Sequence, residues 1–173
     1  MSNAMNGFRY IHKAIRQELD EMEALALAAL DGGASDGRFG ERLAFLRSAV
    51  QVHAAGEDEV MYPALDGRVP QVSRSYALDH DYEEKTFEAM AVTLAELGAA
   101  TTDERRRMLH QHLYRQSVAL NATLSLHIWK EEDQLLPLQD THFSAAEQGA
   151  MAGKIIAHIP PPMMLALVPW MLK

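Results

Sequence analysis

Four long stretches of the chain repeat apolar residues at steps of three and four, and this period constrains the fold more than any other feature. The first stretch shows it in Ile11, Ile15, Leu19 and Met22, with no proline or glycine between them. Turn signals rich in Gly, Asp or Pro separate the stretches. Short polar connections between such helices predict an all-α fold, an antiparallel up-down-up-down four-helix bundle. The helices are expected over about 8–30, 38–65, 73–97 and 102–136.

The chain beyond the fourth stretch is short and increasingly apolar. Pro137 is expected to end the fourth helix, and Ser144 with Glu147 forms a capping box that opens a further short helix. The tail at 159–171 is too apolar for a solvated linker. We expect it to pack on the bundle, to contact a protein partner or to lead into a further domain.

Length, composition and charge are those of an ordinary globular protein. The 173 residues are 48% hydrophobic and 23% charged. We expect one domain over 5–173, with the bundle at about 8–137 and a short C-terminal helical extension at about 138–173; residues 1–4 look like an expression scar. The net charge of −8 argues against a nucleic-acid-binding surface, and no apolar run approaches the roughly 20 residues that span a bilayer. These features predict a cytoplasmic protein that binds neither nucleic acid nor membrane.

Three histidines on the predicted helices are each followed by a glutamate four residues later. The pairs are His53 with Glu57, His80 with Glu84, and His127 with Glu131. Residues four apart share a helix face, and His12 adds an imidazole on the first helix. If the apolar stripes face inward, these side chains converge, and a buried glutamate is costly unless it is paired or bound to a metal. We interpret the set as a metal centre inside the bundle.

Each of these residues also has a simpler explanation. A lone histidine on an apolar face is more often a hydrogen-bonded core residue, and a His–Glu pair at this spacing is usually a surface pair. Glu84 fits a solvated acidic turn as well as a ligand, and Glu132 competes with Glu131 for the same role. Tyr62 is interpreted as a core aromatic residue. The joint pattern, with a histidine on each of four helices, is what favours a metal.

The chain contains no cysteine, so any metal must bind to nitrogen and oxygen ligands. Imidazole with carboxylate suits first-row transition metals, iron and manganese among them, and also zinc. The set can hold two ions but is too small to saturate two six-coordinate ones, which leaves room for water, dioxygen or another small ligand. The Glu-x-x-His pattern of ferritin-like di-iron sites and the His-Glu-x-x-His pattern of zinc proteases are absent.

The ordered set resembles the hemerythrin-like, or HHE cation-binding, domain family, whose pattern is His, His-x-x-x-Glu, His, His-x-x-x-Glu. The matching positions are His12, His53 with Glu57, His80, and His127 with Glu131. The run His142-Phe143-Ser144 and the proline-rich segment ending at Trp170 also look similar to the hemerythrin-like repeats of BRUTUS-type iron-sensing ubiquitin ligases of plants. The resemblance implies a four-helix bundle with two iron ions in a non-haem centre bridged by the two glutamates. Manganese or zinc would be substitutes.

Two departures from oxygen-carrying hemerythrins shape the expected function. Their additional histidine would fall at Tyr76 or Glu84 in this chain, and their fourth-helix aspartate at Glu132. A carboxylate-richer site is less suited to simple oxygen carriage, so the resemblance implies a domain that binds or senses dioxygen, nitric oxide or iron status. Catalysis is not the first expectation, and the alternative is an oxidoreductase acting on peroxide or nitric oxide. A third hypothesis is an interaction module whose histidines only fill the core.

Overall fold

The computed structural model describes residues 6–33 and 36–173. The expression scar expected at residues 1–4 lies outside this part of the chain. Every regular element in the described ranges is helical, so the prediction of an all-α fold is confirmed. The elements are α1 (Asn6–Leu30), α2 (Asp36–Gly56), η1 (Glu57–Met61), α3 (Tyr62–Asp66), α4 (Arg74–Ala99), α5 (Asp103–Lys130), η2 (Glu131–Leu135), α6 (Leu136–His142), α7 (Ala145–His158) and α8 (Pro161–Met171).

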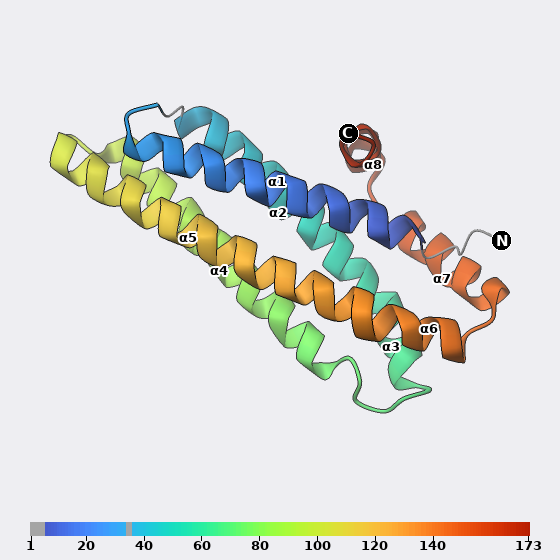
Figure 1. The fold of residues 1–173 in the computed structure, drawn as a ribbon. Helices are drawn as coiled ribbons and strands as arrows, with labels where there is room; N and C mark the ends of the chain where they lie inside the picture. The colour runs from blue at the N-terminus through green and yellow to red at the C-terminus, as the bar shows by residue number, and fades with distance from the viewer. Residues whose placement is uncertain (1–5, 34–35) are drawn as a thin grey trace.

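Four long helices, α1, α2, α4 and α5, lie side by side and alternate in direction (Figure 1). Helix α1 contacts α2 and α5, and α4 contacts the same two helices from the other side. Their apolar stripes meet in a core in which the following side chains are almost wholly buried: Ile15, Leu46, Met90, Leu124 and Ile128. Each such burial contributes about 1.5–3 kcal/mol, and together they orient the four helices. The predicted bundle is confirmed.

Local sequence signals set several helix ends. Thr102 accepts a hydrogen bond from the backbone N–H of Arg105 at 3.2 Å and caps the start of α5. Ser144 and Glu147 form the predicted capping box at the start of α7. After α1, Gly32 has a φ of 80°, a left-handed conformation that glycine adopts without steric cost. These residues determine where the chain leaves one helix and enters the next.

Helices α2 and α5 both continue through a widened, π-helical turn into a short further helix. The turns η1 and η2 begin at Glu57 and Glu131, and Pro63 and Pro137 lie in the first turn of α3 and α6. A proline ring clashes with the carbonyl four residues earlier, and a wider turn before it relieves the clash. The expectation that Pro137 ends the fourth helix is wrong, because α6 runs on to His142.

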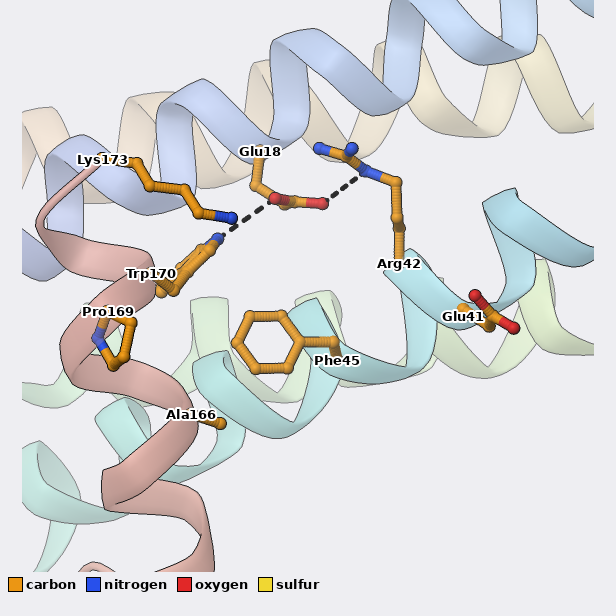
Figure 2. A pocket seen from close by; sticks show the side chains of 8 residues that line it. All are labelled: Glu18, Glu41, Arg42, Phe45, Ala166, Pro169, Trp170 and Lys173. Carbon is orange, nitrogen blue, oxygen red and sulfur yellow. Dashed lines mark hydrogen bonds and ion pairs between the residues drawn. The ribbon is translucent and has the colours of Figure 1, made fainter.

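The C-terminal extension returns to the bundle as α7 and α8 (Figure 1). Ile155 of α7 lies against the backbone at Gly56, the last residue of α2. Figure 2 shows Trp170 of α8 beside Glu18 of α1, to which its indole N–H donates a hydrogen bond of 3.1 Å. The same ring meets Phe45 edge-on, with 5.3 Å between centroids. The apolar tail therefore packs on the bundle, one of the three arrangements that the sequence left open.

No single helix in the described ranges is long and apolar enough to cross a membrane. Helices α7 and α8 together reach that length and composition, but they are bent by 116° at their junction.

Candidate metal centre

Six of the seven residues singled out in the sequence meet inside the bundle. They are His12 from α1, His53 from α2, Glu57 from η1, His80 from α4, His127 from α5 and Glu131 from η2. All are buried except His80, which is partly buried with 9% of its side chain exposed. Each of these polar residues lies on the apolar face of its helix, and that face is turned toward the core, as predicted from the sequence.

The six side chains form two overlapping groups of four. His12 and His53 belong to one group, His80 and His127 to the other, and Glu57 and Glu131 to both. Within each group the candidate ligand atoms all lie within 4.8 Å of one another. The two Nε2 atoms are 3.1 Å apart in the first histidine pair and 3.2 Å apart in the second. An imidazole pair therefore lies on either side of one shared pair of carboxylates.

Each glutamate reaches both histidine pairs. Glu57 Oε1 is 3.2 Å from His53 Nε2, and its Oε2 is 3.3 Å from His80 Nε2. Glu131 Oε2 lies 3.4 and 3.5 Å from one Nε2 atom of each pair. Both carboxylates are therefore placed so that they could bridge two metal ions.

Buried oxygen atoms without partners show that these residues fit a cation. Both carboxylate oxygens of Glu57 and Oε2 of Glu131 are buried and have no hydrogen-bond partner. An unsatisfied buried polar atom costs about 1–3 kcal/mol, and a charged one costs more. A bound cation would satisfy these oxygens, and iron, manganese and zinc all accept imidazole together with carboxylate.

Without a cation, the two glutamates are driven toward opposite protonation states. Burial, together with the nearby charge of Glu131, raises the pKa of Glu57 well above its usual range. Burial acts on Glu131 in the same direction, but contacts with His12 and His127 hold its pKa well below the usual range. Burial also lowers the pKa of His53 well below its usual range, which keeps this imidazole neutral. Because ligands must be deprotonated, metal binding is expected to displace a proton from Glu57.

Glu132 lies behind His12 and not between the histidine pairs. His12 Nδ1 is 3.0 Å from Glu132 Oε1, and Arg16 Nη2 donates to Oε2 of the same carboxylate at 3.0 Å. The contact with His12, supported by Arg16, lowers the pKa of Glu132 to about 2. Such outer partners fix the tautomer and the ring orientation of a ligating histidine. Glu131 is therefore a candidate metal ligand, whereas Glu132 supports His12 from outside the cluster.

His80 and His127 have similar partners behind them. His80 Nδ1 is 3.1 Å from Asp58 Oδ2, and His127 Nδ1 is 3.3 Å from Asp79 Oδ2. Asp79 also forms an ion pair with Lys130. Neither aspartate was predicted from the sequence to support the centre.

One repeated pattern could have revealed part of this support. His, three residues, Glu, an acidic residue, four residues and Pro occur in that order at 53–63 and again at 127–137. The acidic residue after each glutamate is Asp58 in the first copy and Glu132 in the second, and each contacts the Nδ1 atom of a histidine on another helix. The two π-helical turns thus perform the same task.

Glu84 does not join the cluster, and the structure corrects its grouping with the ligands. Its carboxylate accepts a hydrogen bond of 3.0 Å from Arg47 Nε on the flank of α2. The preceding Glu83 lies inside: it is 2% exposed, its Oε1 is 3.8 Å from His127 Nδ1, and neither oxygen has a hydrogen-bond partner. Burial raises the pKa of Glu83 to about 7. The step of three from His80 leads into the core, whereas the step of four leads to the flank.

Tyr62 adds a hydroxyl group on the His80 side of the cluster. The ring is buried, as predicted, but its hydroxyl also donates to Glu131 Oε1 at 2.8 Å and lies 3.4 Å from His80 Nε2. Tyr76, one of the two positions considered for a further histidine, donates to Gln134 at 2.9 Å. Nothing in the sequence separates Tyr62 from a packing residue, because its contacts come from η2 and α4.

Comparisons with known proteins place the chain. Residues 4–147 match the family model described as the hemerythrin HHE cation binding domain. Zinc finger protein BRUTUS of Arabidopsis thaliana is 36% identical over 94% of this chain and 13% of its own length. Two BRUTUS-like zinc finger proteins of the same plant, At1g18910 and At1g74770, are each 30% identical over 95% and 96% of this chain.

The chain spans about 13% of the length of these curated relatives. No solved structure gives a significant match. The family match covers all six clustered residues, and the buried His and Glu cluster is the feature that a cation-binding domain requires. The chain belongs to the hemerythrin HHE cation-binding domain family.

Proposed function

We propose that the chain binds two iron ions between its long helices and that this non-haem di-iron centre binds or senses dioxygen, nitric oxide or iron status. The observation that carries the proposal is that two groups of four side chains share Glu57 and Glu131. A site for one ion needs no such sharing. Manganese or zinc would be accepted by the same donors.

The residues have distinct tasks in this proposal. His12 and His53 would hold one ion, His80 and His127 the other, and both glutamates would bridge. This arrangement gives each ion about four protein ligands, fewer than the six that an octahedral ion takes. Bound iron supplies one-electron chemistry and free coordination positions for a small ligand.

The surroundings favour sensing over simple oxygen carriage. Neither of the two positions considered for a further histidine holds one: Tyr76 donates to Gln134, and Glu84 accepts from Arg47. Carboxylates stand behind three of the four histidines, at Glu132, Asp58 and Asp79. Such partners raise the basicity of an imidazole ligand and favour a more oxidised metal. A centre of this kind suits a response to oxygen or iron better than repeated, reversible delivery of dioxygen.

Metal analysis after anaerobic loading tests the proposal. The unmodified chain is expected to hold about two iron ions after removal of free metal, as a pair of bridging carboxylates requires. Glu57→Gln removes a bridging charge and is expected to lose at least one ion. Glu84→Gln is the matched control, because Glu84 also follows a histidine by four residues but pairs with Arg47. Less than about one iron per unmodified chain, or equal losses in the two variants, contradicts the proposal.

The second candidate is an oxidoreductase acting on peroxide or nitric oxide. The Tyr62 hydroxyl favours it, because a neutral phenol in contact with Glu131 and His80 lies where it could donate a hydrogen bond to a small molecule bound at the centre. Steady-state consumption of peroxide or nitric oxide by the iron-loaded chain tests this candidate. Turnover no faster than that of an equal amount of free iron excludes it and leaves the sensing function.

A further inference from the structure

An acidic groove runs between α2 and α4 and ends at the candidate metal centre. It encloses about 370 Å³. Five carboxylates line it, with no lysine or arginine among the lining residues. The carboxylates are Asp58, Glu59, Asp81, Glu83 and Glu84. His80 also lines the groove, so the groove touches the centre itself.

The other three histidines do not line this groove. Behind His12, Glu132 is held by Arg16, and behind His127, Asp79 is held by Lys130. The Phe8 ring lies 5.4 Å from that of His53. Of the four histidines, His80 lines the groove, and the acid behind it has no lysine or arginine partner within the described ranges.

That acid is Asp58. Its side chain is 43% exposed, and among the described residues no lysine or arginine lies within ion-pair distance of it. Asp58, Glu132 and Asp79 each contact Nδ1 of a histidine. They differ in their cation partners, because Glu132 pairs with Arg16 and Asp79 with Lys130. The His80 side is therefore the side on which an incoming cation meets uncompensated negative charge.

Glu83 marks the inner end of the groove. It is 2% exposed, and neither of its oxygens has a hydrogen-bond partner. It belongs to neither group of candidate ligands, yet it lies 3.8 Å from His127 Nδ1. A buried carboxylate without a partner is costly, and a passing cation would satisfy it.

We infer that this groove is the route by which divalent cations reach the centre, with Asp58 as the outer contact and Glu83 as an inner transfer ligand on the Nδ1 side of His127. The inference rests on the proposed metal-binding function. Acid-lined clefts concentrate cations and raise association rates by about 10-fold to 1,000-fold. Glu83 would bind the cation in transit and release it to Glu57 and His80, without remaining a ligand.

The neighbouring cavities are less suited to this role. A cavity of about 70 Å³ beside His127 is much smaller, and its lining includes Lys130, which forms an ion pair with Asp79, as well as Glu83. A cavity of about 340 Å³ between α8 and the bundle, shown in Figure 2, includes none of the six clustered residues, and two cations, Arg42 and Lys173, line it beside two glutamates. Both therefore present cationic groups where a metal ion would have to pass.

Stopped-flow loading of the metal-free chain with Co²⁺ tests the route. Cobalt is a suitable probe because it does not oxidise during loading and gives a visible spectrum when it binds imidazole and carboxylate. Glu83→Gln is expected to slow loading about tenfold or more while the final cobalt content stays the same. Ala54→Phe, which narrows the groove without changing charge, is expected to slow it as well. Glu88→Gln removes the same charge from α4 outside the groove, at a side chain that is 61% exposed, and should load normally.

Three results would overturn the route. The first is unchanged loading in both groove variants. The second is equal slowing by Glu88→Gln, which would mean that net charge alone sets the rate. The third is a loss of bound cobalt at equilibrium in Glu83→Gln with a normal loading rate, which would make Glu83 a resident ligand. A chain that holds no cobalt at equilibrium instead contradicts the proposed function, and the route with it.

Discussion

Among single residues, the two shared glutamates differ in what holds them. Tyr62 donates to Oε1 of Glu131, whereas neither oxygen of Glu57 has a hydrogen-bond partner. The protein thus orients Glu131, whereas no hydrogen bond fixes the orientation of Glu57. This asymmetry gives Tyr62 a positioning role, because the hydroxyl acts on the centre through Glu131.

Removing that hydroxyl should weaken both the metal-free fold and the centre. Tyr62→Phe leaves Glu131 Oε1 without its donor, and a buried hydrogen bond to a charged group is worth about 1.5–3 kcal/mol. Metal affinity should fall about 10-fold to 100-fold, the usual effect of losing a partner behind a ligand. Urea unfolding and competition with a chelator measure the two effects. Tyr82→Phe, at a ring that is 56% exposed, is the control, and equal behaviour of the two variants would remove Tyr62 from the centre.

Residue spacing explains both what the sequence predicted and where it failed. Residues three and four positions further along a helix lie about 60° and 40° to either side of the starting side chain. His53 with Glu57 and His127 with Glu131 point inward at the step of four, but on α4 the step of three does so and brings in Glu83. Whether Glu83 or Glu84 points inward depends on Arg47 of α2, which contacts Glu84 only once the helices have packed.

At the level of whole elements, the centre depends on two π-helical turns. Glu57 and Glu131 are each the first residue of such a turn, and a proline follows each by six positions. The extra residue in the turn rotates all later side chains by about 100° around the helix axis. Apolar periodicity cannot predict this, because a period of 3.6 residues continues across the turn with a shift of only one position. The helix lengths were therefore predictable, whereas the widened turns and the continuation past Pro137 were not.

The start of η1 is also where α7 packs. A Cβ atom at Gly56 would lie 2.7 Å from Ile155 Cγ2, so Gly56→Ala should displace α7 and destabilise the chain by about 1–3 kcal/mol. Gly40→Ala in the same helix has its nearest neighbour at 4.0 Å and should stabilise it by about 0.5–1 kcal/mol.

Urea unfolding measures both changes. Ile155→Ala combined with Gly56→Ala should recover much of the loss, because the clash disappears with the isoleucine side chain. Destabilisation by Gly56→Ala that persists in the double variant would show that the glycine is needed for some reason other than the contact with α7.

In the molecule as a whole, the polar centre is a layer between two apolar clusters. On α1, Phe8 belongs to the cluster at the π-helical turns, Ile15 to the cluster along the bundle, and His12 lies between them. The same order holds on α4, from Tyr76 through His80 to Phe87, whereas beyond α2 and α5 the residues of the first cluster lie in η1, α3 and η2. Packing on both sides therefore fixes the layer. Such a layer confines buried negative charge, and the metal-free chain is therefore expected to lose stability where its carboxyl groups must ionise.

Glu83 allows this cost to be measured. Burial raises its pKa from 4.5 to about 7, so the folded chain holds this proton more tightly than the unfolded chain does. The stabilising effect of the proton is complete below pH 4.5 and is lost as the pH rises through 7. Glu83→Gln keeps the shape of the protonated acid at every pH. The metal-free variant should therefore unfold at nearly the same urea concentration as the unmodified chain near pH 5, and be more stable by about 3 kcal/mol at pH 8.

Glu88→Gln, at an exposed acid on the same helix, should show no such pH-dependent gap. A gap that is constant between pH 5 and 8, or one that favours the unmodified chain at pH 8, would mean that Glu83 is compensated in the folded protein and carries no buried charge for a cation to relieve.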